Sequence, residues 1–162
     1  MKKRLTLILL VVALLVAAAV FTVQADETTT PTNLDLTTFN CPCSKCGGKP
    51  YTGTWITSWK WPMADGDHVY LSNGSATPSS TLGHNVTGEF VLVLDNYTIN
   101  STVTGRVFTL AKGTMHIVGN NGVLQGKSMS STTGTGGLIQ VYNDSGAGVL
   151  NLHGTETGTL TI

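Results

Sequence analysis

The stretch VLVLDNYTIN, residues 91–100, decides the fold class of this chain. It holds two short runs rich in Val, Leu and Ile, separated by the turn residues Asp95 and Asn96. Such runs, bounded by Gly, Asn and Asp, are typical of short β-strands. Similar runs continue from residue 67 to residue 162, and none has the 3.6-residue period of a helix. The sequence therefore predicts an all-β structure after its N-terminal part.

The pattern of this stretch recurs along the chain. Leu92, Leu94 and Asn96 have counterparts one repeat earlier, one repeat later and once more after a longer interval. Asn and Gly occupy the last of these positions, and both tolerate positive φ, so a turn of fixed geometry is expected there. The columns are Val69/Leu92/Met115/Leu150, Leu71/Leu94/Ile117/Leu152 and Asn73/Asn96/Gly119/Gly154, with Ile99/Leu124/Leu160 and Phe108, Leu110 against Ile139, Val141 further along.

A repeating unit of about 23 residues with short strands suits one coil of a parallel β-helix, in which stacked coils bury a common core. We predict a right-handed, single-stranded parallel β-helix of about four coils, with the first two columns facing inward. The extra residues of the last period are expected as loop insertions around 128–137 and 143–148. A β-sandwich of antiparallel hairpins is the alternative, and the aligned Asn/Gly column favours the β-helix.

Residues 67–162 also resemble a known family. VLVLDNYTIN (91–100) looks like a coil of the pectate-lyase-like right-handed β-helix repeat proteins of bacterial surfaces. DGDHVYLSNG (65–74) resembles their entry strand, and RVFTLAKGTMHIVGNNGVLQG (106–126) and the segment 136–162 resemble their later units. The resemblance implies the fold and says little about activity, because this fold hosts lyases, hydrolases, adhesins and inert stalks.

The N-terminal part has the layout of an export signal. Met1-Lys2-Lys3-Arg4 is followed by an apolar stretch and by the small-residue site Val23-Gln24-Ala25, which predicts a secretory signal peptide over residues 1–25. An uncleaved membrane anchor is the alternative, and would be the only membrane contact. We expect a secreted or surface-displayed protein with a Thr-rich, disordered or extended spacer (26–40), a Cys/Trp-rich capping segment (41–66) and the β-helix (67–162).

Charge limits the partners. Six of the nine Lys and Arg, and all nine Asp and Glu, lie after residue 25, so the exported part carries a net charge of about −3. So few cations argue against a nucleic-acid partner, because such proteins neutralise phosphates with Lys and Arg. A polysaccharide or a host or cell-surface glycan is the expected type of partner.

The three cysteines of the chain, Cys41, Cys43 and Cys46, lie close together in the sequence. Cys43-Ser44-Lys45-Cys46-Gly47 resembles half of a zinc ribbon, in which two thiolates share one metal ion. Cys41 is a candidate third ligand, and the fourth would be a distant residue such as His68. Export favours a disulfide, Cys43–Cys46 or Cys41–Cys46, with one thiol left over. Structural zinc, a disulfide and free thiols therefore all stay open.

Aromatic and polar side chains give weaker candidates for ligand contact. Trp55, Trp59 and Trp61 precede the first coil and either cap its open end or stack on sugar rings. His116, Asn151 and His153 are expected to face outward, near Asp95, where they form either a binding face or a solvated surface.

Catalysis finds little support in the sequence. The exported part has one arginine, Arg106, its carboxylates are scattered, and it has no nucleophile elbow, phosphate loop or HExxH motif. We therefore expect a non-catalytic module for adhesion, carbohydrate contact or a structural stalk. The alternative is the N-terminal part of a polysaccharide lyase or glycoside hydrolase whose catalytic coils follow residue 162, because the last strand, 159–162, has no visible cap.

Overall fold

A computed structural model describes residues 32–84, 87–104, 107–127, 139–141, 148–156 and 158–162. The predicted signal peptide and the insertion at 128–137 lie outside the described residues, as does most of the insertion at 143–148. The described chain is all-β. Its strands are β1 (His68–Ala76), β2 (Leu82–His84), β3 (Glu89–Thr104), β4 (Phe108–Leu110), β5 (Gly113–Asn120), β6 (Gly122–Lys127), β7 (Ile139–Val141), β8 (Gly148–Gly154) and β9 (Leu160–Thr161).

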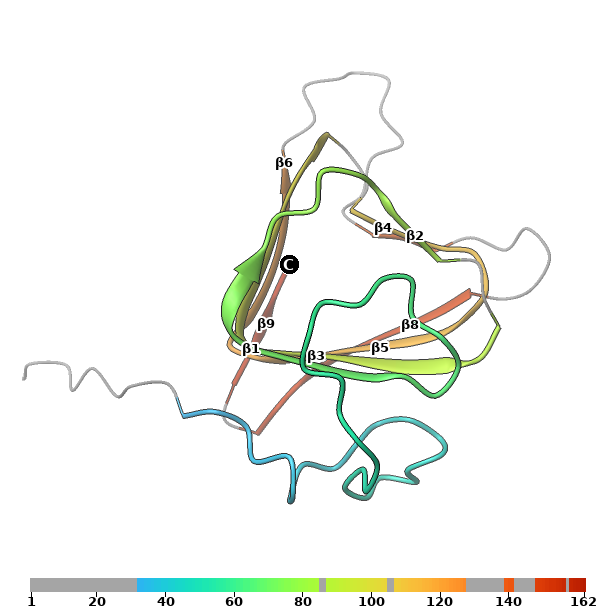
Figure 1. The fold of residues 1–162 in the computed structure, drawn as a ribbon, viewed down its shortest axis with the longest axis vertical. Coiled ribbons are helices and arrows are strands. Elements are labelled where there is room, and N and C mark those ends of the chain that lie inside the picture. The colour runs from blue at the N-terminus through green and yellow to red at the C-terminus, as the bar shows by residue number, and fades with distance from the viewer. Residues whose placement is uncertain (1–31, 85–86, 105–106, 128–138, 142–147, 157) are drawn as a thin grey trace, which may run out of the picture. The chain divides into compact units, whose positions relative to one another are not determined.

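Every pairing between these strands is parallel. The larger sheet has the order β8-β5-β3-β6-β9, with β1 also paired to β3, and the smaller sheet has the order β2-β4-β7. The long strand β3 pairs with β5 through its first half and with β6 through its second half. The larger sheet therefore bends around an apolar interior, and the smaller sheet faces that interior from the other side (Figure 1).

The register between strands confirms part of the predicted repeat. Val69 lies opposite Leu92, one repeat later, as expected. The next step along the stack is longer by two positions, so Leu92 lies opposite Ile117, and the predicted partner Met115 lies opposite Phe90 instead. A slip of two residues keeps every side chain on the same face of a strand, so residue types alone could not reveal it.

The later strand pairings confirm most of the predicted partners but not all of them. The longer interval predicted for the last period is confirmed between β5 and β8, where Met115 lies opposite Leu150. The pairings of Phe108 with Ile139 and of Ile99 with Leu124 are confirmed as well. Leu160 is the exception, because it pairs with Gly122 rather than with Leu124.

Asparagines with positive φ turn the chain at one corner. Asn73 and Asn96 have φ of 50°, and Asn121 has φ of 56°. The first two were predicted, but the third position is Asn121 rather than Gly119, because of the two-residue slip. Gly119 instead lies close against Leu160. A Cβ atom added at this glycine would lie only 2.5 Å from the Cβ of Leu160, so no larger residue fits without a shift.

The interior is filled by the side chains that alternate inward along each strand. Phe90, Leu94, Ile99, Phe108 and Ile117 are all at most 1% exposed, and they belong to one core cluster. These inward positions include those predicted for β1 and β3. At the far end of the stack, the inward-facing Leu152 of β8 is 47% exposed, because no further strand covers it among the described residues.

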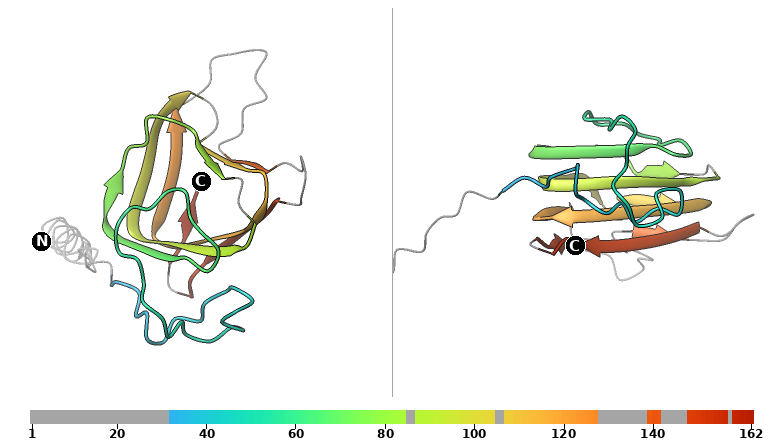
Figure 2. Two further views of the ribbon diagram at one scale, coloured as in Figure 1. Left: turned by 45° about the vertical axis from the view of Figure 1, so that its right-hand side comes forward. Right: turned by 90° about the horizontal axis from the view of Figure 1, so that it is seen from below.

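The outer face of β1, β3 and β5 is buried as well. Val91, Val93 and Val118 point away from the interior and are at most 1% exposed, because residues 32–55 cross these strands and cover them. We call residues 32–55 the strap. Figure 2 shows the strap in blue and teal, running across strands that lie one above another. The part of the predicted spacer that the structure describes is thus packed against the sheet.

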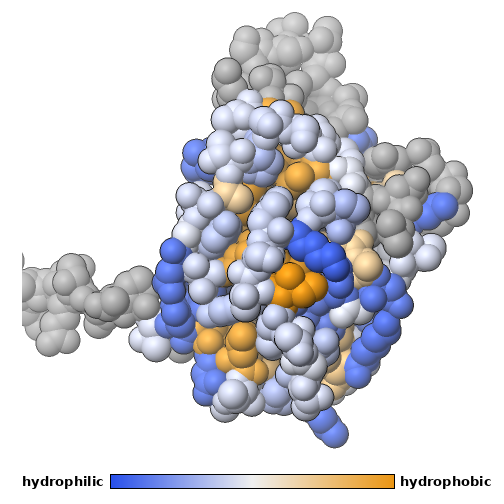
Figure 3. Space-filling model, viewed as in Figure 1, coloured by the Kyte–Doolittle hydropathy of each residue, from blue (hydrophilic) through white to orange (hydrophobic). Residues whose placement is uncertain are grey.

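Residues 56–63 then close the first edge of the sheet. Ile56 lies opposite Val69 in a parallel bridge that extends the sheet beyond β1. Its amide donates to the carbonyl of His68, and its carbonyl accepts from the amide of Tyr70, both at 2.9 Å. Met63 is 1% exposed, and the ring of Trp61 packs edge-on against Phe108 at 5.1 Å. Seen from this side, apolar residues surface only in scattered patches between polar ones (Figure 3).

Candidate metal centre

The strap forms a tight turn at the three cysteines. The backbone N–H groups of Cys46 and Gly47 both donate to the carbonyl of Cys43 at 3.2 Å, and that of Cys41 donates to Lys49 at 3.1 Å. Gly47 has a φ of 61°, a conformation that glycine adopts without steric cost. The turn therefore places all three thiols on one side of the loop.

His68 completes the cluster from the first position of β1. Its Nε2 lies 3.4 Å from Sγ of Cys43 and 3.6 Å from Sγ of Cys46, and the Sγ atoms of Cys41 and Cys43 are 3.4 Å apart. All four ligand atoms lie within 4.8 Å of one another. A tetrahedral zinc site with ordinary bond lengths separates two sulfurs by about 3.8 Å, and a sulfur from a nitrogen by about 3.6 Å. The four side chains could therefore bind a metal ion such as zinc.

The surroundings of His68 suit a metal ligand. Its Nδ1 donates to the carbonyl of Gly66 at 2.8 Å, which leaves the lone pair of Nε2 directed at the thiols. The ring of Tyr51 stacks on the imidazole at 3.6 Å, and Trp55 contacts it edge-on at 5.5 Å. Burial lowers the pKa of His68, so the imidazole is held in its neutral form, which is the form that binds metal.

Burial also changes the pKa of the thiols. Cys41 and Cys43 are at most 2% exposed, whereas Cys46 is half-buried. Burial raises the pKa of Cys41 and of Cys46, because a thiolate loses its hydration there. A divalent cation would supply the charge that stabilises the thiolates in this setting.

A chain of hydrogen bonds links the cysteine turn to the sheet below it. The amide of Ser44 donates to both carboxylate oxygens of Glu89 at 2.9 Å, and its hydroxyl donates to Oε2. Nε2 of His116 lies 2.9 Å from Oε1 of the same carboxylate, and its Nδ1 lies 3.1 Å from Nε2 of His153. Burial raises the pKa of Glu89, but Ser44 and His116 outweigh it, so the net shift is downward.

The order in which Ser44, Glu89 and His116 are hydrogen-bonded determines which chemistry they can perform. In a serine nucleophile site, the imidazole stands between the hydroxyl and the carboxylate, so that it can take the hydroxyl proton. Here Glu89 stands between Ser44 and His116, so the imidazole does not reach the hydroxyl. The arrangement fits a structural link between the cysteine turn, β3 and β5.

A second polar node holds the start of the strap. Asp95 is fully buried, and its carboxylate accepts from the backbone amide of Leu34 at 2.8 Å and from Nδ2 of Asn120 at 2.7 Å. The hydroxyl of Tyr70 and Nδ2 of Asn96 donate to it as well. These four donors come from the strap and from β1, β3 and β5, so the buried carboxyl group joins four segments of the chain.

The predicted aromatic residues do not form one platform. Trp55, the last residue of the strap, packs against Tyr70 and His68. Trp61 donates from Nε1 to the carbonyl of Gly83 at 3.1 Å and lies against the interior. Of the three tryptophans, only Trp59 is exposed, with 37% of its surface accessible to solvent.

The predicted outward residues lie on the outer face, but that face is not open. His116 is 5% exposed, and Asn151, its partner in register, is half-buried together with His153. The expectation of a binding face or a solvated surface at these residues did not include the strap, which packs against the outer face of β3 and β5. Glu89, Ser44, Tyr51 and Asp95 were not foreseen as parts of these networks. The signal for them was the apolar outer face, because Val91, Val93 and Val118 alternate with the core positions and require a cover.

Comparison of the chain with family models, curated proteins and solved structures found no match. In the part of the chain that the structure describes, no helix is long and apolar enough to span a membrane.

Proposed function

We propose that this chain is a non-catalytic, exported scaffold: a right-handed parallel β-helix whose outer wall is covered by a strap that a structural zinc ion fastens. The observation that carries the proposal is the convergence of Cys41, Cys43, Cys46 and His68 within 4.8 Å. Three of these ligands belong to the strap, and the fourth belongs to the first strand of the sheet. One ion would thus join two segments that are 22 residues apart at their nearest ligands.

The donor set favours zinc and a structural role. Three thiolates and one imidazole match the Cys3His sites of zinc, whereas calcium and magnesium take oxygen ligands. Four protein ligands fill a tetrahedral shell and leave no position for water or substrate, which separates structural from catalytic zinc. The burial of Cys41 and Cys43 supports a closed site.

The repeat in the pairing supports the β-helix. Each part of β1 and β3 pairs in parallel with a strand one period later, and all the walls enclose one core. The export signal in the sequence supports a place outside the cytoplasm, where a scaffold would display its surface. An adhesive or stalk-like role follows from this placement, and the metal would make the display surface rigid.

Metal analysis of the purified chain tests the proposal. We expect one zinc per chain, and chelation should lower the melting temperature. His68→Gln should abolish zinc binding, whereas His153→Gln, which alters a histidine outside the cluster, should keep it. A chain that binds no zinc, or one in which mass spectrometry finds a disulfide among the three cysteines, would overturn the metal site.

A turnover assay tests the other part of the proposal, the non-catalytic role. Neutral polysaccharides and polyuronates incubated with the zinc-loaded chain should release no reducing sugar or unsaturated product. Turnover by this chain would overturn the non-catalytic role and leave the metal site standing.

A further inference from the structure

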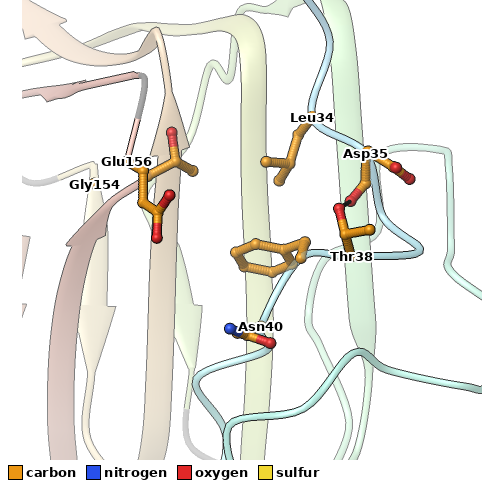
Figure 4. Close-up of a pocket in the computed structure, with 8 residues that line it drawn as sticks. Leu34, Asp35, Thr38, Asn40, Gly154 and Glu156 are labelled. Atoms are coloured by element: carbon orange, nitrogen blue, oxygen red, sulfur yellow. Dashed lines mark hydrogen bonds between the residues drawn. The ribbon is translucent and has the colours of Figure 1, made fainter.

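A hollow of about 430 Å³ lies where the strap meets the end of β8. Its walls come from residues 34–40 of the strap and residues 154–156. In Figure 4, Leu34, Asp35 and Thr38 line one side, Glu156 lies on the other, and Asn40 lies near the base. The volume falls in the usual range for small-ligand sites, about 300–1,000 Å³.

Both walls are fixed to the same buried group. On the strap side, the amide of Leu34 donates to Asp95 at 2.8 Å. On the other side, the hydroxyl of Thr155 donates to Oδ1 of Asn120 at 2.9 Å, and Nδ2 of Asn120 donates to Asp95 at 2.7 Å. The hollow is thus held in shape before any ligand arrives, which lowers the entropic cost of binding.

The lining combines hydrogen-bond acceptors with apolar surface. Oδ1 of Asp35 accepts from the amide and hydroxyl of Thr37 at 2.9 and 2.7 Å, and Figure 4 shows this carboxylate pointing away from the hollow. The hydroxyl of Thr37 lowers the pKa of Asp35, so this carboxylate adds negative charge beside the hollow at neutral pH. Glu156 is exposed and supplies a carboxylate from the opposite wall, while Phe39 and Leu34 supply apolar surface.

The charge of the lining narrows the class of ligand. Two of the lining residues are acidic and none is Lys, Arg or His, so the hollow repels uronates, sulfates and phosphates. The lining also does not suit a metal ion, because among the described residues only the cysteine and His68 cluster brings three or more metal-ligating side chains together. A ring with several hydroxyl donors and an apolar face matches both the carboxylate of Glu156 and the apolar side chains.

We infer that this hollow binds a neutral hexose unit of a glycan, with Glu156 accepting hydrogen bonds from its hydroxyls and Phe39 contacting its apolar face. This site goes beyond the proposed scaffold, because it lies apart from the metal cluster and gives the scaffold a ligand.

Calorimetric titration of the zinc-loaded chain with neutral oligosaccharides tests the inference, with homologous series of gluco-, galacto- and manno-oligosaccharides as probes. At least one series should bind, and Glu156→Ala should weaken it about tenfold or more, since a hydrogen bond to a charged acceptor is lost. Gln125→Ala, at an exposed position on β6 outside the hollow, should bind as the parent chain does.

The inference would be overturned if no neutral series binds, if the Glu156→Ala variant binds equally well, or if the chain prefers oligogalacturonate. Binding of calcium or of cationic glucosamine oligomers in place of neutral sugars would overturn it too. Zinc content measured on the same samples keeps the two proposals apart. A fully loaded chain that binds no sugar refutes only the sugar site, and a zinc-free chain refutes only the metal site.

Discussion

Nε2 of His68 lies 3.4 Å from Sγ of Cys43, although 25 residues separate them in the sequence. The contact joins the strap to the first residue of β1, and Tyr51 and Trp55 surround it. The cluster therefore does more than close a small loop, because it ties the cover of the outer wall to the wall itself.

Trp55 should report on the metal. Its ring contacts His68 edge-on at 5.5 Å and is half-buried against Phe39 and Tyr51, so release of the ion should expose it to water. We expect chelation to shift the tryptophan emission to longer wavelength. Trp55→Phe should bind zinc and lose most of this shift, whereas Trp59→Phe should retain it, because Trp59 is already exposed. An unchanged spectrum in the parent chain after verified zinc removal would contradict the coupling.

Asp95→Asn should destabilise the protein strongly. The backbone amide of Leu34 and Nδ2 of Asn120 donate to opposite oxygens of this buried carboxylate, so either orientation of an amide sets a donor against a donor. Replacing a buried, hydrogen-bonded charge in this way costs about 2–4 kcal/mol. Chemical denaturation measures the loss.

Asp65→Asn is the matched control for that experiment. Asp65 pairs with Lys45 at 2.9 Å, but both side chains are more than half exposed, and such surface pairs contribute little to stability. Oδ1 of Asp65 also accepts from the backbone amide of Glu89 at 3.0 Å, and the side-chain oxygen of Asn can still accept this bond. Equal losses for the two variants would show that Asp95 does not anchor the strap.

Asn73 tests the corner of the fold. Its φ of 50° lies in the left-handed region, and its side chain is exposed. Asn73→Ala should cost about 1 kcal/mol, because a Cβ-bearing residue other than Asn or Asp is strained there, whereas Asn73→Gly should be close to neutral. Thermal unfolding of the two variants compares them directly. A larger loss for glycine than for alanine would mean that the corner does not adopt this conformation.

Much of this architecture can be predicted from residue types, because alternation fixes which side chains face inward. Val69 and Leu92 were placed correctly for that reason. Met115 was placed against the wrong partner, because a slip of two residues preserves the face. His68 was predicted as a candidate for the fourth ligand, and its Nε2 lies within 4.8 Å of the three thiols.

The strap could not be placed from the sequence. Polar Thr-rich segments usually stay solvated, and the groups that anchor this one are far away in the chain. Asp95 is 61 residues from Leu34, whose amide it holds, and Glu89 is 45 residues from Ser44. Tertiary hydrogen bonds of this kind leave no local pattern. The apolar residues at the outward positions of β3 and β5 show that a cover is needed but do not identify it.

Glu89 should make stability depend on pH in the acid range. Ser44 and His116 hold its pKa in the folded protein below the ordinary value of 4.5, despite the opposing effect of burial. A carboxyl with a lowered pKa stabilises the fold fully above about pH 4.5, and this contribution is lost as the pH falls through the folded value. Glu89→Gln should therefore be less stable than the parent chain at pH 6 by about 1–2 kcal/mol, and the two should converge as the pH falls through the lowered pKa of Glu89 in the folded protein.

Denaturation curves at a series of pH values, with zinc retention measured in each sample, give this difference. Ser44→Ala should reproduce it in the same direction with a smaller size, because the amide of residue 44 still donates to the carboxylate after the hydroxyl is gone. A difference between the parent chain and Glu89→Gln that stays constant as the acid range is scanned downward from pH 6 would show that the carboxylate charge does not hold the cysteine turn to β3.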